Sequence, residues 1–63
     1  MCLSTVYKNT KENTSILMKN VMRIDCQDGC VTLTDLMDRQ ISIEGQLLQA
    51  NLVDGFVIVK APD

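Results

Sequence analysis

The sequence predicts an all-β protein: a single small domain, residues 1–63, folded as an SH3-like or Sm-like barrel of about six or seven short antiparallel strands. Three observations predict this class. Apolar and polar residues alternate in short runs, tight turns containing glycine separate the runs, and no helical period of 3.6 residues persists along the chain. Many short strands joined by tight turns favour a closed or sandwiched sheet.

The predicted strands are short runs rich in β-branched and aliphatic residues: 2–8, 16–18, 21–27, 30–34, 41–44, 47–53 and 56–60. Asn20 marks a kink between two of them, and Gly45 stands where a barrel needs a sharp bend. Residues 35–39 are expected to form a charged loop, with Leu36 and Met37 folded back over one end of the barrel.

Residues 21–34 give the clearest hairpin. Their alternation has a period of two, and Asp28-Gly29 tolerates the positive φ angles of a two-residue type I′ turn. This turn sets Cys26 opposite Val31, so that the apolar side chains of both arms share one face. Cys26 is then expected in the core and Cys30 on the surface. Only a three-residue loop, which is the alternative, would set the two cysteines opposite each other.

The last hairpin, with a predicted two-residue turn at Asp54-Gly55, is apolar on both faces. Its turn pairs Val53 with Phe56 and places these two residues with Ile58 on the face opposite Leu52. An antiparallel strand pair with one face in water should carry polar residues on that face. Because both faces of this hairpin are apolar, we expect the second face to be covered. The cover is either a segment of the same subunit or a twofold contact with a second copy, which the small size of the chain favours.

Composition disfavours several classes of function. The formal charge is −2, the six Lys and Arg are scattered, and the chain has one Phe and one Tyr, so the composition disfavours nucleic-acid binding. The chain has no histidine for an acid–base pair and no glycine-rich phosphate loop, and we therefore expect no enzymatic activity. No apolar run approaches a membrane span and no signal peptide is recognisable, which favours the cytoplasm.

Cys2 is the candidate metal ligand. It follows Met1, so its thiol lies beside the amine or the first amide of the chain, and nitrogen and sulfur donors together favour Ni(II) or Cu(II) over Mg²⁺ or Ca²⁺. One terminus offers two or three donors, whereas a tetragonal ion takes four. Two copies of Cys2 meeting across a twofold axis would complete the set, with one ion per dimer.

Residues 1–7, 31–36 and 52–55 resemble the CooT family, and the matching length extends the resemblance over almost the whole chain. These are small nickel-binding proteins associated with maturation of the nickel site of carbon monoxide dehydrogenase. The resemblance implies a small β-barrel homodimer that binds nickel through Cys2, acts as a metallochaperone, and has a nickel enzyme such as carbon monoxide dehydrogenase as its client. The alternative is a β-barrel adaptor or RNA-binding-type module in which Cys2 is merely structural.

Overall fold

The computed structural model describes residues 3–62, so that the predicted ligand Cys2 lies outside the described residues. Within this range the chain forms six strands and one 3₁₀ turn: β1 (Ser4–Lys8), η1 (Asn13–Ser15), β2 (Ile16–Gln27), β3 (Cys30–Asp35), β4 (Gln40–Glu44), β5 (Gln46–Asn51) and β6 (Phe56–Lys60). The predicted all-β class and the number of strands are confirmed.

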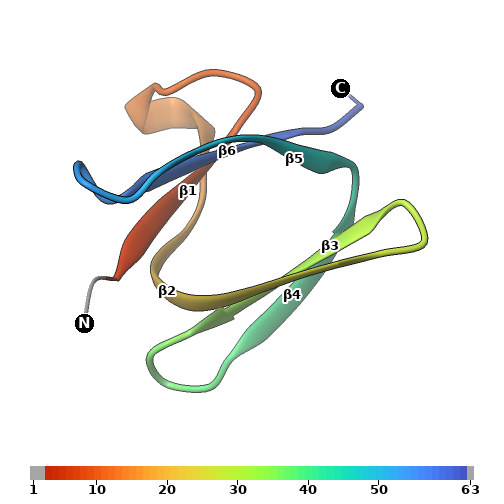
Figure 1. Ribbon diagram of the computed structural model, residues 1–63, viewed down its shortest axis with the longest axis horizontal. Helices are drawn as coiled ribbons and strands as arrows, with labels where there is room; N and C mark the ends of the chain where they lie inside the picture. Colours follow the sequence, from red (N-terminus) through yellow and green to blue (C-terminus); the bar gives the residue numbers. More distant parts are fainter. Residues whose placement is uncertain (1–2, 63) are drawn as a thin grey trace.

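The strands form one sheet in the order β4-β3-β2-β1-β6-β5, and this sheet curls so that its two halves face each other. Figure 1 shows β1, β5 and β6 in the upper half and β3, β4 and the second half of β2 in the lower half. Of the five strand pairs in the described part of the chain, four are antiparallel, as predicted.

The pair β1–β6 is parallel, which the sequence prediction of antiparallel strands missed. The cause is the bend at Gly45. β4 and β5 follow each other through this single residue and do not pair in the sheet, so the chain turns a corner there without a hairpin reversal. A Cβ atom at Gly45 would overlap the backbone carbonyl oxygen of Lys60, and glycine alone permits this close approach.

β2 is one continuous strand of 12 residues, where the sequence suggested two shorter ones. The predicted kink at Asn20 is present: its φ angle is 57°, and the pairing register shifts between Val21 and Arg23. The first part of β2 pairs with β1 and the second part with β3, so this kink carries the chain from one half of the sheet to the other.

The β2–β3 hairpin confirms the predicted register. Cys26 pairs with Val31 and Gln27 with Cys30, and the turn residues Asp28 and Gly29 have φ angles of 53° and 78°. The alternative three-residue loop is therefore wrong, and adjacent strand positions hold the two cysteines on opposite faces of the hairpin.

The predicted register of the last hairpin is wrong. Asn51, and not Val53, pairs with Phe56, which makes residues 52–55 a four-residue loop. The Asn51 side chain explains the longer loop, because its oxygen accepts hydrogen bonds from the backbone N–H groups of Val53 (3.1 Å) and Asp54 (2.9 Å). Leu52 and Val53 thus leave the sheet.

The second face of this hairpin is covered by the same subunit. The ring of Tyr7 meets Phe56 edge-on at 6.4 Å between centroids, and the Lys11 ammonium lies 4.4 Å from the centre of the Phe56 ring. Ile58 is buried beside Tyr7, its neighbour on β1. The segment 7–11 of the chain itself therefore accounts for the apolar residues at 56 and 58.

The core is small and mostly valine. Its buried members come from β1, β2, β3 and β6: Val6, Val21, Val31, Leu33, Val57 and Val59. Half-buried side chains of β2 and β4 pack around them: Leu17, Met18, Ile24, Ile41 and Ile43.

Candidate functional site

The start of β1 is held from two sides. Ser4 pairs with Val21 at the kink of β2, and the N–H of Thr5 donates a hydrogen bond of 3.0 Å to the carbonyl oxygen of Gly55. The chain therefore enters the barrel between the bend of β2 and the loop 52–55. These contacts fix the position of Ser4, which is two residues after Cys2 in the sequence.

The loop 52–55 carries two aliphatic side chains outward. The side-chain oxygen of Asn51 accepts the two backbone hydrogen bonds described above, and its side-chain NH₂ donates a third, of 3.1 Å, to the carboxylate of Asp54. The N–H of Gly55 also donates a hydrogen bond of 3.0 Å to the backbone carbonyl oxygen of Asn51. Leu52 is exposed, and Val53 is 95% exposed. The loop thus holds a fixed shape while its apolar side chains contact water.

The loop between β3 and β4 is fixed by the carboxylate of Asp35, which is buried. Its oxygens accept hydrogen bonds from the N–H groups of Met37 and Arg39, both at 2.9 Å, and from the Arg39 guanidinium at 2.8 Å. Leu36 and Met37 are nonetheless exposed, Met37 by 72%. The expectation that these two side chains fold back over the barrel is wrong, because the carboxylate occupies the interior position.

The environment of Asp35 stabilises its charged form. Burial by itself raises the pKa of this carboxyl. The hydrogen bonds from the backbone and guanidinium of Arg39, the Arg39 charge and the Met37 amide outweigh burial, and they hold the pKa below its usual value of 3.8. Asp35 is therefore an ionised structural anchor of its loop and not a solvated loop residue.

An apolar groove of about 310 Å³ lies between β2 and β5, where the two halves of the sheet separate. It is lined by side chains of β1, β2, β5, β6 and the loop 52–55: Ser4, Val21, Met22, Arg23, Ile24, Cys26, Leu47, Ala50, Leu52 and Val57. Cys26 is on the predicted face but exposed, so its expected core position is wrong. The halves of the sheet are too far apart at this edge to bury it.

Cys30 is exposed, as predicted, on the opposite face of the hairpin. Within residues 3–62, no three His, Cys, Asp or Glu side chains lie close enough together to hold a metal ion. The same range contains no helix long and apolar enough to cross a membrane. The structure therefore brings neither Cys26 nor Cys30 into a metal-binding group of the described residues.

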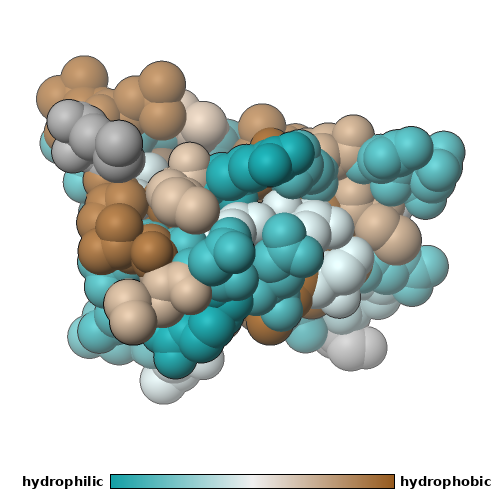
Figure 2. Space-filling view, turned by 90° about the horizontal axis from the view of Figure 1, so that it is seen from below, coloured by the Kyte–Doolittle hydropathy of each residue, from teal (hydrophilic) through white to brown (hydrophobic). Residues whose placement is uncertain are grey.

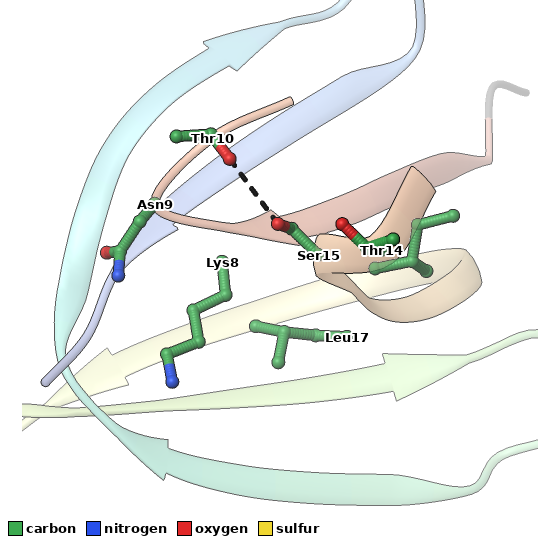
Figure 3. A pocket seen from close by; sticks show the side chains of 7 residues that line it. Lys8, Asn9, Thr10, Thr14, Ser15 and Leu17 are labelled. Carbon is green, nitrogen blue, oxygen red and sulfur yellow. Dashed lines mark hydrogen bonds between the residues drawn. The ribbon is translucent and has the colours of Figure 1, made fainter. Parts of the chain in front are cut away.

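A second hollow, of about 470 Å³, lies beside the turn η1 (Figure 3). Lys8, Asn9 and the hydroxyl groups of Thr10, Thr14 and Ser15 line it, and the hydroxyls of Thr10 and Ser15 are 3.3 Å apart in a hydrogen bond. No carboxylate or thiol lines this hollow, so its chemistry does not suit a thiophilic metal ion.

The fold and the exposed apolar groove define the class of the protein as a small β-barrel-like domain. A crystal structure of putative CooT from Carboxydothermus hydrogenoformans has a similar fold: the TM-score is 0.83 at 13% sequence identity, and the match covers 98% of this chain and 100% of the other. No curated protein matches the chain.

A family model described as CO dehydrogenase accessory protein CooT matches residues 1–60. The chain therefore belongs to the CooT family, which confirms the resemblance found in the sequence. The family is described as an accessory protein and not as an enzyme.

Proposed function

We propose that this protein is a nickel-binding accessory protein of the cytoplasm, which binds Ni(II) through Cys2 as a homodimer and delivers the ion to a nickel enzyme such as carbon monoxide dehydrogenase. Membership in a family of CO dehydrogenase accessory proteins supports the client. The pairing of a thiol with terminal nitrogen donors at Cys2 supports the metal.

The observation that carries the proposal is where the first strand starts. Ser4 lines the apolar groove, and the loop 52–55 is bonded to Thr5, so the first described residues after Cys2 lie beside an exposed apolar surface. A second copy that covers this groove by twofold symmetry would bring two chain starts toward the same axis. Two Cys2 residues near such an axis would provide two sulfur and two nitrogen donors.

The groove itself supports a homodimer. Leu47 and Ala50 on β5 face Ile24 and Cys26 on β2, and three of these four residues are exposed while Ile24 is half-buried. A domain of this size buries only about 60% of the surface that its unfolded chain exposes, so a partner subunit is a common source of additional core. A twofold contact over the groove would bury apolar surface that the monomer exposes to solvent.

A terminal site suits delivery. It would have few protein ligands per subunit and no surrounding cage, and such an ion can be taken over by competing ligands more readily than one in a closed tetrahedral site. The metal is cargo in this proposal and does not contribute to folding.

The test is nickel titration followed by native mass spectrometry of three proteins: wild type, Cys2→Ser, and the double variant Cys26→Ser, Cys30→Ser. We expect one nickel ion per dimer for the wild type and the double variant, and none for Cys2→Ser. A thiolate-to-nickel absorbance band should be absent from Cys2→Ser and present in the other two proteins.

Two results would contradict the proposal. If Cys2→Ser retains nickel and the double variant loses it, the ligand is on the hairpin. If no protein binds nickel at micromolar concentration, the adaptor function with a structural Cys2 replaces the metallochaperone function. If sedimentation shows a monomer, a nickel site shared by two subunits is excluded, but nickel binding by the terminus of one subunit is not.

A further inference from the structure

Two loops of this protein have the same construction. In each, an Asp or Asn at the end of a strand is followed by Leu, a second apolar residue and Asp: residues 35–38 after β3 and residues 51–54 after β5. We refer to them as the paired loops. In both, the oxygen of the first side chain accepts hydrogen bonds from backbone N–H groups two and three or four positions later.

The paired loops present apolar side chains in a fixed geometry. The Asp35 and Asn51 side chains hold the backbone, while Met37 (72% exposed) and Val53 (95% exposed) extend into water. Exposed aliphatic side chains normally bring a monomer no stability. A preorganised backbone reduces the entropy that a surface loses on binding, so this combination is typical of a docking surface.

Both loops lie at the end of the barrel where β1 starts. The N–H of Leu36 bonds to the Asn20 carbonyl at 2.9 Å, next to Val21, the partner of Ser4. The carbonyl of Gly55 receives the Thr5 N–H. Figure 1 shows the two loops on the same side as the start of β1, and Figure 2 shows apolar residues gathered at this end.

The charge of the paired loops indicates the kind of partner. Three aspartates belong to them, Asp35, Asp38 and Asp54, and Arg39 directly follows the first loop. Arg39 is bonded to the buried Asp35, which leaves one exposed carboxylate beside the apolar side chains of each loop, Asp38 in the first and Asp54 in the second. Opposite charges across an interface attract and like charges directly opposed repel.

We propose that the paired loops bind a client protein whose surface carries an apolar patch surrounded by Lys and Arg. A second copy of this chain is the poorer occupant, because a twofold contact between these loops would set their exposed carboxylates near each other. The inference rests on the proposed delivery function, and it places the docking surface beside the terminus that would release the metal. Of the paired loops only Leu52 lines the groove between β2 and β5, so the rest of that groove remains for the homodimer.

The experiment measures binding of purified, nickel-free carbon monoxide dehydrogenase to wild type and to Met37→Ser and Val53→Ser, whose side chains do not line the groove. Each variant should bind about tenfold more weakly, which corresponds to about 1.4 kcal/mol. Asp38→Asn, which keeps a residue type that tolerates the φ angle of 65°, should weaken binding at low salt and not at high salt. The matched control is Leu48→Ser, a 56% exposed residue of β5 outside both loops, and it should bind as the wild type does.

Sedimentation and nickel titration of the same variants separate the outcomes. Docking is supported if Met37→Ser and Val53→Ser bind the enzyme weakly while they keep the wild-type oligomeric state and nickel content. It is overturned if they become monomers, if Leu48→Ser weakens binding equally, or if the wild type does not bind the enzyme. Cys2→Ser should dock normally without nickel, so a failure of metal binding and a failure of docking give different results.

Discussion

Leu33 is the residue whose truncation tests the fold most directly. Its side chain has no exposed surface and lies between Ile24 of β2 and Ile41 of β4, its partners on the two sides. Leu33→Ala removes apolar contacts on both sides and leaves a cavity, a change that costs about 3 kcal/mol in tightly packed cores. A 63-residue domain has a total free energy of unfolding of roughly 3–9 kcal/mol at typical values per residue. The variant should therefore lose a third or more of its stability.

The assay is urea unfolding and thermal unfolding at one fixed protein concentration, because a dimer would make both concentration-dependent. We expect the melting temperature to fall by roughly 12–24 °C at an unchanged urea m-value. Leu48→Ala, the exposed control, should change the free energy of unfolding by no more than about 0.5 kcal/mol. A loss below about 1 kcal/mol for Leu33→Ala, or equal losses for the two variants, would refute the placement of the core.

Gly45→Ala should destabilise the fold by roughly 1–3 kcal/mol, because its Cβ must displace the backbone of Lys60; an unchanged urea midpoint would contradict this corner. Asp35 should stabilise the fold fully above pH 3.8, and this contribution should be lost as pH falls further, through the lowered pKa of the folded state. Urea midpoints of wild type and Asp35→Asn should therefore differ at neutral pH and converge in acid, and a constant difference would be inconsistent with the ionised anchor. In native Cys2→Ser, Cys30 should react rapidly with a thiol reagent and Cys26 slowly, because the proposed homodimer covers the groove that Cys26 lines; equally rapid reaction of both thiols would contradict that contact.

Local turn chemistry made the β2–β3 hairpin predictable. Asp28-Gly29 is a strong signal for a two-residue turn, and the alternation on both arms allows one register that gathers the apolar side chains. The same reasoning failed at Asp54-Gly55, because both arms are apolar and two registers bury similar surface. There the Asn51 side chain decided the register through its hydrogen bonds to the loop backbone, a local effect that competes with the sheet.

Long-range geometry was less accessible from the sequence. The parallel pairing of β1 with β6 depends on whether the chain reverses or only bends at Gly45, and one glycine permits either. The exposure of Cys26 likewise depends on how far the two halves of the sheet separate, whereas alternation predicts only its face. The candidate ligand Cys2 was a prediction of terminal chemistry and family resemblance, and it remains a prediction because the described chain begins at Leu3.

The paired loops share a sequence pattern that a search for strands does not reveal: an Asp or Asn followed by two apolar residues and Asp. Leu52 reads as part of a strand because it continues the apolar run 47–53, whereas residues 35–39 already read as a loop. In both loops, the preceding Asp or Asn captures the following N–H groups and stops the strand. Two aliphatic residues directly after such a side chain are then held outside the sheet, where they gain nothing from the core. This pattern occurs twice in 63 residues, and both copies lie on the side of the barrel where the first strand starts, so the proposed docking gives their exposure a role that folding does not.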